Sequence, residues 1–209
     1  MPWPVPERDA ITGVVLAGGE GRRMGGVDKG WVDLAGRPLV ERVLATLRPQ
    51  AGALLISANR SLAAYRGLGV PVVTDRLTGG LGPLAGIHAA LAATETDYLL
   101  AAPCDTPCLP PDLGTRLGRA LAAADAAIAA VEVEGRLQPL HALIRADLAD
   151  DLAAALAAGV RKPSDWYGRH PWVRVPCDDV APAFANLNTP AECAALAAEM
   201  ERNRSGSCA

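Results

Sequence analysis

The sequence predicts an α/β fold with one mostly parallel sheet and an antiparallel addition at its edge. Short apolar runs alternate with segments of helical periodicity through much of the chain, as in βα units. Glycine-rich or polar loops follow several of these runs, where an open parallel sheet places its ligands. Two strand-like runs then follow one another across Gly135, which predicts a hairpin or an added antiparallel strand. The length of 209 residues suits a single domain with a sizeable core.

The expected strands are apolar runs bounded by turn-forming residues. They cover residues 11–16, 53–57, 70–74, 98–102, 126–134, 140–145 and 173–175. Helices are expected where apolar residues recur at helical spacing. The first starts at Pro38, which suits the first turn of a helix, and stops before Pro49. The expected helices cover residues 38–48, 61–68, 87–93, 113–124, 147–158 and 191–201.

The composition and the termini limit the possible classes of protein. A net charge of −3 argues against wholesale binding of nucleic acid, which normally requires a basic excess. The five cysteines form no CxxC pair and are odd in number, which predicts a reducing, cytoplasmic location. No uncharged apolar stretch reaches membrane-spanning length, so no membrane association is expected. We expect an N-terminal extension over residues 1–10, one domain over 11–202 and a disordered tail over 203–209.

The segment from Gly18 to Lys29 has the layout of a phosphate-binding loop. It follows a buried strand and carries five glycines, two arginines and a lysine. Glycines let backbone N–H groups approach an anion closely, and the cations stabilise its charge. A Walker A loop is excluded, because Val27 and Asp28 stand where Lys and Ser or Thr are required. The dinucleotide fingerprint fails at Met24, and the remaining alternative is a solvated glycine-rich turn.

Polar residues also stand at the ends of the other predicted strands. Asp105 follows an apolar strand and lies between two prolines that restrict the backbone, so it is the best metal-ligand candidate. Magnesium favours one or two carboxylates together with phosphate oxygens and water, so a single Asp suffices; a capping role is the alternative. Asn59 and Asp75 occupy equivalent positions, where a turn residue and a helix cap are the competing interpretations. A second glycine-rich loop at residues 78–86 could lie under a base or ribose.

The first loop resembles the signature of nucleotidyltransferases, and its Leu16-Ala17-Gly18-Gly19 form resembles the molybdenum cofactor guanylyltransferase family. Further segments resemble this family in the same order along the chain. They are Ala58-Asn59-Arg60, Asp75, Gly82-Pro83-Leu84-Ala85-Gly86, Pro103-Cys104-Asp105-Thr106-Pro107 and Asn186-Leu187-Asn188-Thr189-Pro190. The resemblance covers most of the chain, with residues 1–10 outside it.

This resemblance implies a three-layer, Rossmann-like nucleotidyltransferase fold and a reaction. The family transfers GMP from GTP to the molybdopterin cofactor and releases pyrophosphate, with Mg²⁺ as cofactor. The implied partners are GTP, molybdopterin, and molybdoenzymes or cofactor-handling proteins. The residues implied to contact the nucleotide are Leu16, Ala17, Gly18, Gly19, Lys29, Asn59, Asp75 and Asp105. Asp105 would hold the metal, and Lys29, Arg23 and Asp105 would be catalytic.

The second substrate and the choice of base leave alternatives open. The basic and aromatic segment Arg161–His170 could stack and pair with an anionic aromatic substrate, or could be a solvated amphipathic helix. Arg136–His141 is a second region where pterin contacts are expected. Gly18-Gly19 resembles the guanine-specific family, and Asp75 could accept hydrogen bonds from the N1–H and the amino group of guanine, which cytosine could not supply in the same way. The rival functions are a molybdopterin cytidylyltransferase, another small-molecule nucleotidyltransferase, and a carrier of cofactor or nucleotide without chemistry.

Overall fold

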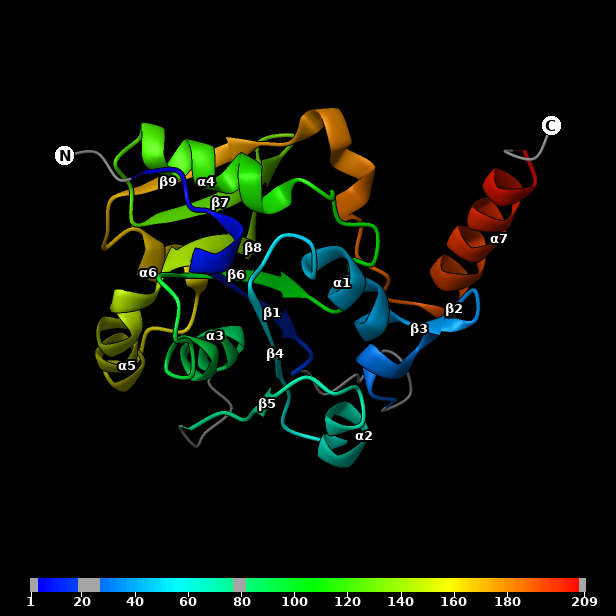
Figure 1. The fold of residues 1–209 in the computed structure, drawn as a ribbon, viewed down its shortest axis with the longest axis horizontal. Helices are drawn as coiled ribbons and strands as arrows, with labels where there is room; N and C mark the ends of the chain where they lie inside the picture. The colour runs from blue at the N-terminus through cyan, green and yellow to red at the C-terminus, as the bar shows by residue number, and fades with distance from the viewer. Residues whose placement is uncertain (1–3, 19–26, 77–81, 207–209) are drawn as a thin grey trace.

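A seven-stranded sheet forms the centre of the protein (Figure 1). The computed structural model describes residues 4–18, 27–76 and 82–206, and the strands in this part of the chain lie in the order β5-β4-β1-β6-β8-β7-β9. Their bounds are β1 Ile11–Leu16, β4 Ala53–Ser57, β5 Val72–Val73, β6 Tyr98–Pro103, β7 Ile128–Val133, β8 Arg136–Arg145 and β9 Trp172–Pro176. A separate two-stranded sheet pairs β2 (Asp33–Leu34) with β3 (Arg37–Pro38).

The sheet is mostly parallel, as the sequence predicts. Strands β5, β4, β1 and β6 all run in one direction, and β9 runs parallel to β7. Strand β8 is antiparallel to both of its neighbours, β6 and β7. The prediction of an antiparallel addition is confirmed, but its expected place at the edge is wrong. The buried apolar residues Ala142, Leu143 and Ile144 pair β8 with β6, and β7 and β9 extend the sheet beyond it.

The hairpin between β7 and β8 is confirmed and contains an irregularity. Glu134 and Gly135 have φ of 49° and 72°, which is the backbone of the tight turn that matches the twist of a two-stranded hairpin. Strand β8 begins at Arg136, earlier than the sequence suggests. Consecutive β7 residues Ala130 and Val131 pair with Ala142 and Gln138, so residues 139–141 of β8 form a bulge.

Helices cover both faces of the sheet and give the expected three layers (Figure 1). One core cluster joins Val15 of β1 to α1 (Leu39–Leu47) and α4 (Leu113–Ala123). The other joins Val14 of β1 to α3 (Pro83–Leu91), α5 (Ala149–Ala157) and α6 (Pro163–Tyr167). Neighbouring β1 residues thus face opposite cores, as the alternation of a β-strand requires. The remaining short helices are α2 Leu62–Arg66, η1 Arg8–Ala10, η3 Lys29–Trp31, η4 Ala146–Leu148 and η5 Asp178–Phe184.

The last helix, α7 (Pro190–Gly206), lies at one side of the molecule, away from the layers on the sheet (Figure 1). Its residue Cys193 packs with Leu34, Leu39 and Leu187 in a third, small core cluster. The helix continues to Gly206, past the expected end at residue 201 and into the expected tail, while residues 207–209 lie outside the described part. Among the described helices, none combines the length and the apolar character needed to cross a membrane.

Candidate active site

Four parallel strands end at the same edge of the sheet and bring the predicted site residues together. Gly18 follows β1, Asn59 follows β4, Asp75 follows β5 and Asp105 follows β6. Backbone hydrogen bonds continue past the strand ends, from Ala17 to the Ser57 carbonyl at 2.8 Å and from Cys104 to the Leu16 carbonyl at 3.1 Å. These bonds hold the loops in register, as in open parallel sheets that bind ligands at this edge.

Lys29 lies at the centre of this edge and joins three distant segments. Its Nζ donates to Asp105 Oδ2 and to Asn188 Oδ1, both at 2.6 Å. The Lys29 and Asp105 side chains are only 20% and 19% exposed, so their ion pair is partly shielded from water. The structure therefore brings together Lys29 and Asp105, two of the three predicted catalytic residues.

Asn188 is a site residue that is not among the nucleotide-contacting residues implied by the sequence. It immediately precedes a capping box, in which Thr189 Oγ1 accepts from the Glu192 backbone at 3.2 Å. Glu192 Oε2 accepts in return from the backbone of Asn188 at 2.6 Å and of Thr189 at 2.9 Å. These backbone hydrogen bonds lower the pKa of Glu192. The Thr-Pro-Ala-Glu pattern marks the start of a helix in the sequence, but only the fold shows that Asn188 reaches Lys29.

The turn that carries Lys29 is fixed by its neighbour Asp28. Asp28 Oδ1 accepts from the Tyr65 hydroxyl at 2.6 Å and from the Gly30 backbone at 3.3 Å, and Arg60 Nε lies 3.7 Å from Oδ2. Burial raises the pKa of Tyr65, so its hydroxyl stays protonated and donates. A Cβ at Gly30 would lie 2.3 Å from the Tyr65 oxygen, so glycine is required there for the close approach.

Asn59 and Asp75 form a reciprocal pair across the ends of β4 and β5. Asn59 Nδ2 donates to Asp75 Oδ2 at 2.8 Å, and the Asp75 backbone donates to Asn59 Oδ1 at 2.9 Å. A Cβ built on Gly18 would lie 3.7 Å from Asn59 Nδ2, so the end of β1 lies beside this pair. Gly18, Asn59 and Asp75 therefore form one continuous surface along the site edge.

Comparison with known proteins identifies the family. The sequence profile described as "MobA-like NTP transferase domain" matches residues 13–178. A protein of Ralstonia nicotianae named molybdenum cofactor guanylyltransferase is 52% identical over 202 residues, which cover 92% of this chain and 98% of that one. The chain belongs to the molybdenum cofactor guanylyltransferase family. A second member, from Cupriavidus pinatubonensis, is 49% identical over 87% of this chain and 94% of its own.

A solved structure supports the same assignment to the molybdenum cofactor guanylyltransferase family at the level of the fold. The molybdopterin-guanine dinucleotide biosynthesis protein A of Archaeoglobus fulgidus superposes with a TM-score of 0.76 at 26% identity. The match covers 91% of this chain and 99% of that one. The nucleotidyltransferase fold implied by the sequence resemblance is confirmed.

The residues Leu16 to Gly18, expected from the guanylyltransferase family motif to contact the nucleotide, differ in how accessible they are to a ligand. Gly19 and Arg23 lie outside the described residues. Leu16 and Ala17 are buried, and the Leu16 carbonyl and the Ala17 N–H are bonded within the sheet. Gly18 is exposed, so it is the member of the described Leu16–Gly18 run that a nucleotide can approach most freely.

In the two segments expected to bind the pterin of a guanylyltransferase substrate, the aromatic rings of Trp166 and Tyr167 are turned inward, whereas the cationic Arg161, Lys162 and Arg169 are exposed. Trp166 and Tyr167 are fully buried, and they donate hydrogen bonds to Asp151 Oδ1 at 2.8 Å and to the Pro139 carbonyl at 2.6 Å. His170 Nε2 lies 2.9 Å from the same Asp151 oxygen. The structure contradicts stacking of a substrate on the Trp166 and Tyr167 rings, because both are fully buried in the core. His141, at the end of the other segment, is also buried.

The donor set at the site suits a metal shared with a substrate more than a metal held by protein alone. No cluster of three or more His, Cys, Asp or Glu side chains in the described ranges could hold an ion. Asp105 supplies a carboxylate whose Oδ2 faces Lys29, and its Oδ1 accepts no hydrogen bond from the described residues. One carboxylate with substrate phosphates and water is the coordination that Mg²⁺ prefers. Asp105 therefore fits the role of a magnesium ligand.

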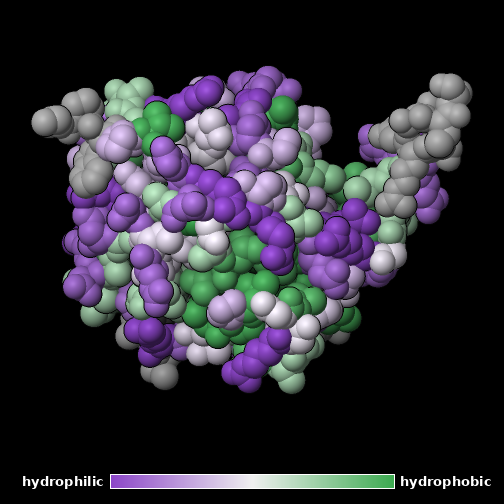
Figure 2. Space-filling view, viewed as in Figure 1, coloured by the Kyte–Doolittle hydropathy of each residue, from purple (hydrophilic) through white to green (hydrophobic). Residues whose placement is uncertain are grey.

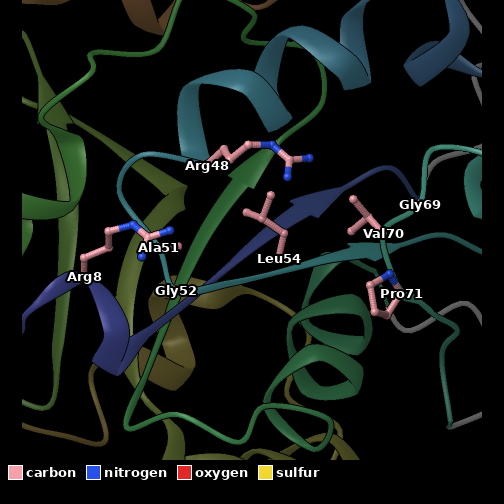
Figure 3. A pocket seen from close by; sticks show the side chains of 8 residues that line it. All are labelled: Arg8, Arg48, Ala51, Gly52, Leu54, Gly69, Val70 and Pro71. Atoms are coloured by element: carbon pink, nitrogen blue, oxygen red, sulfur yellow. The ribbon is translucent and has the colours of Figure 1, made fainter.

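A hollow on the molecule lies at the opposite end of the strands and is distinct from this site (Figure 3). Its lining includes Arg8, which precedes β1, and Gly52, which precedes β4. Figure 3 shows the exposed Arg48 and the apolar Leu54 beside them. Figure 2 shows an apolar area bordered by hydrophilic residues on the face where Figure 1 labels β1 and β4. The hollow lacks the carboxylate and the amide that converge on Lys29.

Proposed function

We propose that the protein transfers GMP from GTP to the terminal phosphate of molybdenum-charged molybdopterin and releases pyrophosphate. The observation that carries this proposal is the Lys29–Asp105–Asn188 arrangement at the carboxyl ends of β1 and β6. In it, a cation and a carboxylate that suits a magnesium ligand lie together at the edge where open parallel sheets bind ligands. The names of the relatives at 52% and 49% identity support the choice of substrate.

The reaction needs positioning and charge stabilisation rather than a nucleophilic side chain. An oxygen of the molybdopterin phosphate forms a bond to the α-phosphorus of GTP, while the bond from that phosphorus to the bridging oxygen breaks. The electron pair leaves with pyrophosphate, and no proton has to be removed because the attacking phosphate is already ionised. In the described part of the chain, the nearest thiol is that of Cys104, whose pKa burial raises to about 12, so it stays protonated.

Lys29 and Asp105 have complementary tasks in this proposal. Lys29 Nζ stabilises the negative charge of the phosphates, and Asn188 holds the ammonium in place. Asp105 would hold Mg²⁺, which neutralises phosphate charge when bound. Arg23, outside the described residues, is proposed as a further cation on the phosphates. The shielding of the Lys29–Asp105 pair from water strengthens these charge interactions.

Guanine is the proposed base. Asp75 can accept from both the N1–H and the amino group of guanine, whereas cytosine lacks this pair of donors. Asn59 holds one Asp75 oxygen, and Oδ1 accepts no hydrogen bond from the described residues. Gly18 adjoins this pair and is exposed, with no side chain of its own between Asn59 and a ligand. A molybdopterin cytidylyltransferase is the second candidate, since solved cytidylyltransferases of methylerythritol phosphate have a similar fold.

The remaining proposals concern the setting of the reaction. We place the protein in the cytoplasm, with molybdoenzymes or cofactor-handling proteins as recipients of the product. A location where thiols stay reduced agrees with the free, buried state of Cys104, Cys177 and Cys193.

The test is pyrophosphate release from GTP, CTP and ATP in parallel, with Mg²⁺ and molybdenum-charged molybdopterin. Release with GTP alone supports both the reaction and the base. Release with CTP alone would retain the reaction and overturn the assignment of guanine to Asp75. No release with any nucleotide, from protein that still binds GTP, would favour the carrier alternative.

A further inference from the structure

A buried histidine lies behind the proposed site and takes no part in the mechanism above. His141 is on β8, in the bulge over residues 139–141 that interrupts the pairing with β7. The following residue, Ala142, pairs with Ala101 of β6, so His141 lies alongside the last residues of β6 and faces the Asp105 turn. Bulges commonly redirect a side chain beside a functional site.

The imidazole contacts the segments that carry both Lys29 acceptors. His141 Nε2 lies 2.9 Å from Thr106 Oγ1, and Thr106 is the residue after Asp105. The ring also packs edge-to-face on Phe184, with centroids 5.1 Å apart, and Phe184 begins the run that leads to Asn188. His141 and Thr106 are 2% and 0% exposed, so water does not substitute for either contact.

The hydrogen-bond directions follow from the available protons. The single Thr106 hydroxyl proton goes to the Pro103 carbonyl at 3.2 Å, so the oxygen must accept from His141 Nε2–H. Burial lowers the pKa of His141 to about 3, so the ring is neutral and carries one proton. Its Nδ1 has no partner among the described residues and remains an acceptor. The histidine therefore holds the turn between Pro103 and Thr106 through Nε2 alone, and its Nδ1 makes no hydrogen bond to the described residues.

The two contacted segments are also tied to each other. The Leu187 backbone donates to the Asp105 carbonyl at 2.9 Å, immediately before Asn188. We propose that His141 is a positioning residue that sets, through Thr106 and Phe184, where Asp105 and Asn188 stand relative to Lys29. This inference rests on the proposed function, because it assigns His141 a role only in the site built on Lys29.

The alternative is a histidine that merely fills the core, and a pair of variants separates the two. His141→Gln can keep a nitrogen donor near the position of Nε2, whereas His141→Leu keeps the bulk without the donor. Thr106→Ser and Thr106→Val make the same comparison from the other side. The readouts are kcat and KM for GTP, the apparent Mg²⁺ requirement and the thermal midpoint of unfolding, with Lys29→Met as the reference.

We expect kcat to fall in the variants that lack the hydrogen bond between residues 141 and 106, whatever their thermal midpoint of unfolding. We expect His141→Leu and Thr106→Val to lower kcat roughly 10- to 100-fold, because small displacements of reacting groups are costly. The Gln and Ser variants should recover at least about tenfold of that loss. The double variant His141→Leu/Thr106→Val should cost little more than either single change.

Two results would overturn the inference without touching the proposed function. One is wild-type kcat in His141→Leu or Thr106→Val while Lys29→Met is inactive. The other is a kcat that follows the unfolding midpoint in all variants, with no recovery by Gln or Ser. If Lys29→Met is itself fully active, the proposed site fails, and the inference about His141 fails with it.

Discussion

The chain contains two clusters of cationic residues that the sequence marks as candidate sites, and the fold uses them differently. Lys29 is bonded to Asp105 and Asn188, which are 76 and 159 residues away in sequence. In the Arg161–His170 segment, Trp166 and His170 are bonded to Asp151, only 15 and 19 residues away. Lys29 of the first cluster joins Asp105, at the end of a strand, to the loop of Asn188, and the second cluster ties α6 to the neighbouring helix α5. A basic cluster is therefore informative about function when its partners are distant strand ends.

The largest effect is expected from removing the carboxylate that pairs with Lys29 of the first cluster. Asp105→Asn should lower kcat about 1,000-fold, because it removes the proposed anionic ligand of Mg²⁺ and the charged partner of Lys29. Steady-state pyrophosphate release over a range of Mg²⁺ concentrations measures this effect. Unchanged turnover in a folded Asp105→Asn protein would remove Asp105 from the reaction.

A smaller effect is expected from Asn188, which holds the other side of the Lys29 ammonium. Asn188→Ala should lower kcat/KM roughly 10- to 100-fold, since it deletes a hydrogen bond to a charged group. The matched control is Asn186→Ala, two residues earlier and exposed. Equal effects of the two substitutions would show that the loop matters only as a whole.

The second cluster should respond in stability rather than in activity. Trp166→Phe removes the indole donor to Asp151 and leaves a small void, and should lower the free energy of unfolding by about 1–3 kcal/mol. Turnover below the unfolding temperature should stay near the wild-type value. Urea unfolding and pyrophosphate release on the same preparation test both parts. A selective rise in the KM for molybdopterin would contradict this prediction and indicate that the Arg161–His170 segment contributes to substrate binding.

The smallest expected effect is a pH dependence at Asp151. The Trp166 hydrogen bond, together with that of His170, holds the pKa of this carboxyl below its usual value. Its contribution to stability is present above the unfolded pKa near 4 and is lost as the pH falls through the lower folded value. The difference in unfolding midpoint between wild type and Asp151→Asn should therefore shrink as the pH falls below the unfolded pKa near 4. A difference that stays constant as the pH falls would contradict the assignment.

The sequence is a good guide to the parts of the fold that depend on local pattern. The apolar runs of β1, β4 and β6 and the amphipathic α1 are correctly predicted, because hydrophobic periodicity determines which face is buried. The position of β8 between β6 and β7 is not predicted, since either strand of an apolar hairpin can pair with the existing sheet. The bulge over residues 139–141 decides which side chains of β8 face which neighbours, and it has no local signal.

The candidate site divides in the same way. Asp105, Asn59 and Asp75 are predictable because each ends a strand of one parallel sheet, and such ends meet at one edge. The contact of Asn188 with Lys29 is not predictable, because Asn188 lies in the loop before α7 and does not follow a strand of the parallel sheet. The aromatic residues of α6 are misjudged for a related reason. Trp166 and Tyr167 complete the core between α5 and β8, and a short polar segment does not show this.

The most direct test of the central claim compares two cations at opposite ends of the same strands. Lys29→Met and Arg48→Met each delete one positive charge, and Arg48 lines the hollow away from the proposed site. Pyrophosphate release at saturating GTP, molybdopterin and Mg²⁺ should fall roughly 100- to 1,000-fold in Lys29→Met and stay near wild type in Arg48→Met. Equal activity of the two variants would contradict the placement of the reaction at Lys29.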